Sequence, residues 1–187
     1  MKKTILSLLA GGLFAFAAQA QTTPAWAYAI GGASGDYASQ LIVDGAGNLY
    51  VGGGFQGTAA FDEAGTTTLT SAGDDDAFVA KYSPTGALLW VKQLGSTGAE
   101  GISGLAFDGS GNIYVAGEFE GTVDFDPNAG TQNATSAGSV DGFLLKLDSN
   151  GAFVSLKHFG GAGYDYVSTV AVDGSDNAYL SIFFENS

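Results

Sequence analysis

The segment Asp124-Phe-Asp126-Pro-Asn128-Ala-Gly130 places oxygen-bearing side chains at alternate positions ahead of a glycine. This alternation is typical of a calcium loop, in which a tight turn aims several carboxylate and amide oxygens at one hard cation. The rest of an EF-hand loop is missing, because its twelfth position is Thr135 and not a glutamate. Two interpretations stay open: a calcium site formed by Asp124, Asp126 and Asn128, or a turn in which these side chains accept backbone hydrogen bonds. No other cofactor is expected.

Other acidic side chains recur at a fixed spacing along the chain. One set pairs an aspartate with an asparagine four residues later, and a second set follows a glycine by five residues. The first set is Asp44/Asn48, Asp108/Asn112 and Asp173/Asn177, and the second is Asp36, Glu100 and Asp165. A catalytic pair of carboxylates would be expected once per protein and not once per repeat. We therefore expect the first set to stabilise tight turns, with metal ligation as the alternative, and the second set to act as structural hydrogen-bond acceptors.

Residues suited to nucleophilic catalysis are scarce. The single histidine, His158, falls in a predicted outer strand, whereas a Ser-His-Asp site needs a histidine beside a serine and a buried acid. The chain has no cysteine, which excludes a thiol nucleophile, a cysteine zinc site and disulfides. The run Asp74-Asp75-Asp76 is interpreted as a solvated loop tip. These residue types favour a protein that is not an enzyme.

The side chains described above are carried by a sequence that repeats three times. Segments 44–55 and 108–119 share the pattern Asp-Gly-x-Gly-Asn-x-Tyr-Val-x-Gly-x-Phe, and 173–183 is a degenerate third copy. Asn48 and Asn112 are 64 positions apart, and Asn112 and Asn177 are 65 apart, a period that indicates a repeat architecture. Each copy opens with turn-forming residues and continues into a β-branched and aromatic strand. The repeated unit therefore contains a β-hairpin.

Each repeat is predicted to hold four strands joined by turns. The first strand is predicted at 39–43, 103–107 and 168–172, and the second strand contains Tyr50, Tyr114 or Tyr179. The third strand is predicted at 77–82 and 142–147, and the fourth at 26–30, 90–94 and 155–159. Polar excursions at 56–75 and 120–140 separate the second strand from the third, with room for a small ribbon. Lys81 and Lys146 on the third strand indicate that polarity increases toward the outside of each sheet.

Four-stranded antiparallel units repeated about an axis are the blades of a β-propeller. We therefore expect an all-β fold of β-propeller-type repeats, without disulfides and incomplete at about two and a half blades. The predicted parts are an outer strand at 26–30, blades at 38–95 and 102–160, and a partial blade at 166–184, within a repeat region that covers 21–187. Propellers close with roughly four to eight blades. We expect further blades of the same chain or self-association, with the 187 residues forming part of a longer protein.

Residues 1–20 have the three regions of a secretory signal peptide. Lys2 and Lys3 give a positive start, 5–18 is an uncharged apolar run, and Ala18-Gln19-Ala20 is a small-x-small cleavage signal. The alternative, a membrane anchor, needs roughly 20 apolar residues, and this run is shorter. The sequence predicts an exported protein without a membrane span, secreted or held at the cell surface.

The formal net charge of −13 disfavours nucleic acid as a partner, because such a surface repels phosphate and no basic patch interrupts it. Charged residues make up 13% of the chain, whereas glycine numbers 30 and aromatic residues make up 12%. This is the composition of short strands joined by many turns and not of a disordered chain.

The order of these motifs resembles the secreted bacterial β-propeller repeat called SBBP. The resemblance rests on Trp-x4-Gly, then an acid, then the Asp-Gly-x-Gly-Asn hairpin, then Phe-Asp, then Asp-x-Phe-Val-x-Lys-Tyr, and it covers 26 to the end of the chain. It implies a four-stranded propeller blade in a large exported bacterial protein, often with adhesion-type modules. The third copy departs from the pattern at Ser181.

The leading hypothesis for function is a non-catalytic exported repeat segment that acts as a scaffold or as a binding or adhesion surface. Its ligand, protein or carbohydrate, is not specified by the fold. The alternatives are a carbohydrate-active propeller enzyme and a calcium-dependent adhesin module. An acid that breaks the repeat symmetry near the channel would favour the enzyme, and calcium binding would favour the adhesin.

Overall fold

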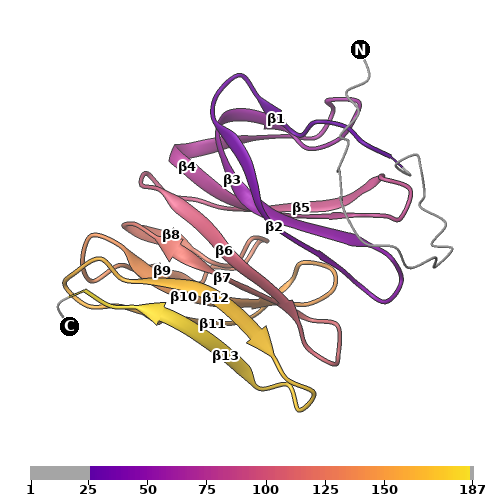
Figure 1. The fold of residues 1–187 in the computed structure, drawn as a ribbon. Helices are drawn as coiled ribbons and strands as arrows, with labels where there is room; N and C mark the ends of the chain where they lie inside the picture. The colour runs from indigo at the N-terminus through magenta and orange to yellow at the C-terminus, as the bar shows by residue number, and fades with distance from the viewer. Residues whose placement is uncertain (1–25, 186–187) are drawn as a thin grey trace, which may run out of the picture.

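The computed structural model describes residues 26–185, and every regular element in this part of the chain is a β-strand. The strands form stacked antiparallel sheets (Figure 1). Their inner strands lie side by side and are β2 (Asp36–Val43), β6 (Glu100–Phe107) and β12 (Tyr166–Val172). The predicted signal peptide, 1–20, lies outside the described residues. No helix in residues 26–185 has the length and apolar character needed to cross a bilayer.

The first blade is a meander of four strands in the order β2, β3 (Leu49–Ala60), β4 (Thr68–Tyr82) and β5 (Leu88–Leu94). Strands β3 and β4 continue past the blade as a ribbon, in which Thr58 pairs with Thr70. The two-residue strand β1 (Gly31–Gly32) adds to the edge of this ribbon. The polar excursion at 56–75 therefore carries the small ribbon that the sequence predicted.

The second blade repeats this order with β6, β7 (Ile113–Phe119), β10 (Asp141–Leu147) and β11 (Phe153–Phe159). Its ribbon is a separate pair, β8 (Thr122–Asp124) and β9 (Asn133–Thr135). The third sheet contains β12 and β13 (Ala178–Phe183). The predicted four-stranded antiparallel blade is confirmed, and within the described residues the sheets do not close into a ring.

The three copies are equivalent residue by residue in their first hairpin. Tyr50, Tyr114 and Tyr179 each stand on the second strand, opposite Ile42, Ala106 and Ala171 of the first. Side chains alternate between the two faces of a strand. Tyr50 therefore lies in the layer toward the second blade, and its neighbour Val51 lies in the layer on the opposite face.

Each inner strand has a β-bulge at the same serine. The ladder shifts register between Ala38 and Gln40, between Ile102 and Gly104, and between Val167 and Thr169, at Ser39, Ser103 and Ser168. A bulge re-aims a side chain out of the regular alternation. Here Ser39 Oγ donates to Ile102 O at 2.6 Å, and Ser103 Oγ donates to Val167 O. The bulged serine therefore ties each of the first two inner strands to the next one.

The hydrophobic core is divided into layers between the sheets. Tyr50 and Val79 of the first blade pack with Leu105 and Val115 of the second. A smaller layer joins the second blade to the third sheet through Leu144 and Val170. Because each layer is shared, every sheet stabilises its neighbour by removing apolar surface from water.

Residues 26–30 do not form the predicted outer strand. Among the described residues, both strands of the third type, β4 and β10, already pair with the outer strands β5 and β11, so no strand edge of this kind is free for 26–30. The segment is held by side chains instead. The rings of Trp26 and Tyr28 lie 6.0 and 5.9 Å from the ring of Tyr82, and Tyr28 Oη donates to Gly86 O at 3.1 Å.

Candidate functional site

The aspartates of the Asp-x-x-x-Asn motif close the hairpin turns, as expected. Asp108 Oδ1 accepts from the backbone N–H groups of Ser110 and Asn112 at 2.9 and 2.8 Å, and Oδ2 accepts from Asn112 Nδ2 at 2.7 Å. Asp44 and Asp173 make the corresponding contacts in the other copies. Carboxylates that accept this many hydrogen bonds are stabilised in the charged form. The Asn177 bonds accordingly lower the pKa of Asp173 to about 2.

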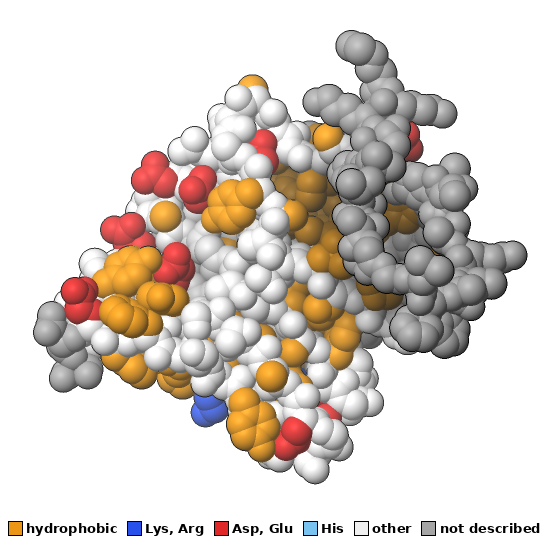
Figure 2. Space-filling view, in the orientation of Figure 1, with side chains coloured by type: hydrophobic (Ala, Val, Ile, Leu, Met, Phe, Trp, Pro, Cys, Tyr) orange, Lys and Arg blue, Asp and Glu red, His pale blue; other side chains and the backbone are white. Residues whose placement is uncertain are grey.

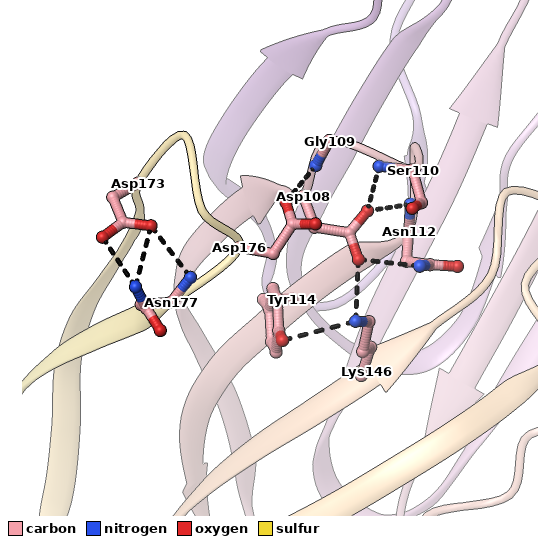
Figure 3. Close-up of polar contacts among 9 residues, drawn as sticks. All are labelled: Asp108, Gly109, Ser110, Asn112, Tyr114, Lys146, Asp173, Asp176 and Asn177. Carbon is pink, nitrogen blue, oxygen red and sulfur yellow. Dashed lines mark hydrogen bonds and ion pairs between the residues drawn. The ribbon is translucent and has the colours of Figure 1, made fainter.

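Lys146 reaches the turn of its own blade and pairs with Asp108 (Figure 3). The Nζ of Lys146 lies 2.7 Å from Asp108 Oδ2, 3.3 Å from Tyr114 Oη and 4.8 Å from the Tyr114 ring centroid. Burial opposes ionisation of Asp108, but the bonds from Lys146 and Asn112 outweigh it and hold its pKa at about 2. The bond to Asp108 in turn raises the pKa of Lys146.

Lys81 occupies the same position in the first blade and lies 4.9 Å from the Tyr50 ring centroid. Its Nζ donates to Ser149 O of the second blade at 3.1 Å. Both lysines are half-buried, and the ammonium group of each lies over the ring of a tyrosine on its own sheet.

Asp176 departs from the repeat, because it stands where the other copies have Gly47 and Gly111. All three residues have positive φ, which is 63° at Asp176, and aspartate tolerates this conformation better than most residues. Its Oδ1 accepts from Gly109 N at 2.6 Å (Figure 3). The non-glycine residue thus links the hairpin turns of the second and third copies.

The second set of repeated acids closes loops at the opposite end of the sheets, which confirms their structural role. Each accepts a hydrogen bond from the backbone N–H four residues earlier: Gly32 to Asp36 at 2.6 Å, Ser96 to Glu100 at 2.8 Å, and Gly161 to Asp165 at 2.6 Å. Burial raises the pKa of Glu100 to about 7 against the opposing hydrogen bonds from Ser96.

Asp76 corrects the expectation of a solvated Asp74-Asp75-Asp76 tip. Its side chain is fully buried, and it accepts from Ala72 N at 3.1 Å and from Gln93 Nε2 at 2.5 Å. Asp141, its equivalent in the second blade, is also buried and accepts from Ala137 N at 3.1 Å. This repeated acid therefore closes the excursion of each blade, whereas Asp74 is exposed and Asp75 is half-buried.

The predicted calcium loop uses its oxygens within the loop. Asp124 Oδ1 accepts from Asp126 N at 3.0 Å and from Gln132 N at 2.7 Å, and Asp126 Oδ1 accepts from Asn128 N at 3.0 Å. The ammonium of Lys92 donates to Asn128 Oδ1 at 2.6 Å. Within residues 26–185, no three His, Cys, Asp or Glu side chains gather in a geometry suited to a metal ion. Of the two interpretations, these contacts favour the turn, and calcium binding by Asp124, Asp126 and Asn128 stays untested.

His158 is exposed on the outer strand β11, where the sequence placed it. Its imidazole faces the edge of Phe119, with 6.3 Å between ring centroids. The contact is with an aromatic ring and not with a serine and an acid, so the geometry supports a surface histidine.

Glu118 is a second acid, besides Asp176, that breaks the repeat symmetry, and sequence reasoning missed it. Glu118 stands on β7 where the other copies have Gly54 and Phe183. Tyr164 Oη donates to Glu118 Oε2 at 2.9 Å, and this bond raises the pKa of Tyr164 to about 12. Burial raises the pKa of Tyr37, and the charges of Asp75 and Glu118 add to the effect. A comparison of the three copies, position by position, would have found this residue.

A cavity of about 400 Å³ lies beside the segment that precedes the first blade. Its lining includes Trp26, Tyr28, Asp62, Glu63 and Leu88. Asp62 is committed to its own turn, where bonds from Thr66 and Thr67 lower its pKa to about 2. Aromatic faces with a few polar groups are the usual lining of a small-molecule site. This cavity and the Glu118 cluster are the two candidate binding regions.

Comparison with known proteins agrees with this geometry. Residues 89–118, which run from the fourth strand of the first blade through the hairpin of the second, match the family SBBP, described as a beta-propeller repeat.

Two relatives align with 56% of the chain. "Regulatory protein FlaEY" of Caulobacter vibrioides is 32% identical over 111 residues, and "Uncharacterized WD repeat-containing protein L264" of Acanthamoeba polyphaga mimivirus is 25% identical over 119 residues. The aligned parts span 11% and 9% of those proteins. The chain therefore carries a β-propeller repeat of the SBBP type, set within antiparallel sheets that repeat its four-stranded pattern.

Proposed function

We propose that this chain is a non-catalytic scaffold of β-propeller repeats that is exported from the cell and presents a binding surface, with adhesion as its role. The observation that carries the proposal is the use of the repeated acids. Asp44, Asp108, Glu100 and Asp165 all accept backbone hydrogen bonds that hold turns or loops. A carboxylate committed to a loop is poorly placed to act as a general acid or a nucleophile.

The symmetry-breaking Glu118 is the observation that favours the carbohydrate-active enzyme as a second candidate. Glycosidases generally use two carboxylates on opposite sides of the scissile bond, roughly 5–10 Å apart. Glu118 is hydrogen-bonded to the phenol of Tyr164, and phenols can orient a sugar or a partner protein without chemistry. This arrangement supports a binding role for the cluster, and the enzyme would need a second carboxylate across the sugar from Glu118.

Export is the part of the proposal that rests on the sequence of residues 1–20. Its test is the mass of the product recovered outside bacterial cells, which we expect to begin at Gln21. A product that keeps Met1 and stays with the membrane fraction would refute export by a cleaved leader.

Binding without turnover is tested with the two tryptophans of the chain, Trp26 and Trp90. Trp90→Phe leaves Trp26, which lines the cavity, as the only tryptophan. Soluble cell-wall oligosaccharides are titrated into this variant while fluorescence and reducing ends are measured. We expect saturable fluorescence change without new reducing ends, and its loss when Tyr28→Ala is added. Release of reducing ends that Glu118→Gln abolishes would establish the enzyme instead.

A further inference from the structure

The outermost sheets of the stack expose faces that are buried at the equivalent positions of their neighbours. Tyr179 on β13 is 60% exposed, whereas Tyr50, at the same position in the first blade, is 1% exposed. Leu41 on β2 is 63% exposed, whereas its equivalents Leu105 and Val170 are both 7% exposed. Tyr50 is covered by the second blade, and Leu105 and Val170 are covered by the preceding sheet. Each open face therefore corresponds to one side of the sheet-to-sheet interfaces that join the first blade to the second and the second blade to the third sheet.

The third sheet also carries the serine that joins one sheet to the next. Ser168 occupies the same bulge as Ser39 and Ser103. Its Oγ donates to Ser181 O within its own sheet at 3.1 Å, whereas Ser39 and Ser103 donate to a carbonyl of the following sheet. Within residues 26–185, Ser168 therefore has the bulge of the inter-sheet bond without a following sheet that supplies the acceptor.

The matching acceptor stands on the open face at the other end of the stack. Ser39 and Ser103 donate to the carbonyls of Ile102 and Val167, each of which comes directly before the bulged serine of its strand. The residue in this position on β2 is Ala38, which is exposed. One chain therefore carries a bulged serine that bonds only within its own sheet at one end of the stack, and the matching exposed carbonyl at the other.

Large apolar side chains are exposed on both open faces. On the third sheet, the rings of Tyr166 and Phe183 are stacked with centroids 5.3 Å apart, and Phe183 is 47% exposed. On the first sheet, Val43 beside Leu41 is 56% exposed. Figure 2 shows apolar side chains gathered beside the carboxyl end of the described chain. Exposed apolar patches of this kind mark interaction surfaces.

We propose that two copies of this chain associate head to tail, with β12 and β13 of one copy stacked on β2 of the second. In this interface Tyr179 packs on Val43, as Tyr50 packs on the equivalent Phe107 with 5.0 Å between ring centroids, and Ser168 Oγ donates to the carbonyl of Ala38. A head-to-tail interface requires two different, complementary surfaces on one chain. Both surfaces are present here, and the two internal interfaces show how they fit. The inference is independent of the function proposed above.

The test is sedimentation velocity of the full chain over a wide range of protein concentration. We expect the wild type to associate reversibly, and Tyr179→Glu or Leu41→Asp to weaken association about a hundredfold or more, because each buries an unpaired charge. An equimolar mixture of the two variants should associate again, because each variant keeps the face that the other has lost. Leu89→Asp, which changes a 51% exposed leucine on the outer strand β5, is the matched control and should associate like the wild type.

A second measurement does not depend on the charged variants. The chain has no cysteine, so Ala38→Cys and Ser168→Cys copies, mixed and oxidised, can form only engineered disulfides. We expect the mixed dimer to exceed both homodimers. A wild type that stays monomeric at all concentrations, a mixture of variants that does not recover association, or equal yields of all three disulfide dimers would overturn the proposal. Recovery of the chain only in complex with another protein would overturn it as well.

Discussion

Replacing Glu100 with glutamine tests the structural role of the loop acids most directly. Glu100 is 2% exposed, and its carboxyl oxygens accept from Ser96 N at 2.8 Å and from Ser96 Oγ at 2.7 Å. Ser96 Oγ also lies 3.0 Å from Glu120 O. A protonated Glu100 can therefore donate to Ser96 Oγ while that hydroxyl donates to the carbonyl of Glu120. Glutamine donates in the same way through Nε2 and so reproduces the neutral form.

The magnitude follows from the raised pKa. Burial moves the pKa of Glu100 from 4.5 to about 7, so the folded protein binds this proton more tightly than the unfolded chain does. At 1.36 kcal/mol per pKa unit, ionisation costs the folded state roughly 3 kcal/mol, and screening by solvent reduces this to about 1–3 kcal/mol. The change of stability with pH has the opposite sign to that of an acid whose pKa is lowered by a salt bridge. The contribution of Glu100 to the free energy of unfolding is fully present below pH 4.5, is lost progressively as the pH rises above that value, and is gone above about pH 7.

The assay is urea unfolding of both proteins at several pH values from 4.5 to 8.5, supported by thermal melts. We expect Glu100→Gln to match the wild type at the acid end and to be more stable by about 1–3 kcal/mol at the alkaline end, roughly 2–4 °C in Tm per kcal/mol. Glu120→Gln removes the same charge from an exposed neighbour and should leave the pH dependence unchanged. A variant that is less stable than the wild type at every pH would refute the reasoning, because it would show that the buried carboxylate is charged and needed.

Three further outcomes are expected. Lys146→Met should destabilise the fold by about 1–3 kcal/mol near pH 7, because it removes the partner of a buried Asp108 carboxylate. The pKa of Asp108 is lowered from 3.8 to about 2 in the folded protein. The loss of stability should therefore fade in acid unfolding as the pH falls toward 2 and Asp108 becomes protonated. Ser103→Ala should cost about 1 kcal/mol in urea unfolding of the dilute monomer, whereas Ser168→Ala should cost less, because, of these two serines, only Ser103 has an inter-sheet acceptor within residues 26–185. Equal losses would contradict the role of the bulge. Calcium should leave the thermal midpoint unchanged, because Lys92 already binds Asn128 Oδ1, and a calcium-dependent rise that Asp126→Ala abolishes would instead establish the calcium loop.

The repeat spacing predicted the sheets well because each blade is a local meander. Asp, Gly and Asn at the turns and alternating apolar residues on the strands specify the hairpins within a short stretch of chain. The outer strand predicted at 26–30 failed for a reason that lies outside that stretch. A strand needs a partner, and each third-type strand in the described residues already has one.

The structural roles of the acidic side chains likewise divide into those set by neighbouring residues in the sequence and those set by residues far away in it. The turn role of Asp108 could be predicted, because its acceptor geometry is fixed by the four residues that follow it. The burial of Asp76 could not, because it depends on Gln93, which reaches it from the neighbouring strand β5. Glu118 meets Tyr164 across 46 positions, and only the stacking of the third sheet on the second brings them together.

The sequence by itself determined the period, the strand content and the turns, because these follow from residue types within one repeat. Only the tertiary structure decided which face of each sheet is covered. The bulge at Ser39, Ser103 and Ser168 is the same in all three copies, yet only the first two serines reach the following sheet. Burial depends on what lies across the layer, and a residue's own position in a repeat does not contain that information.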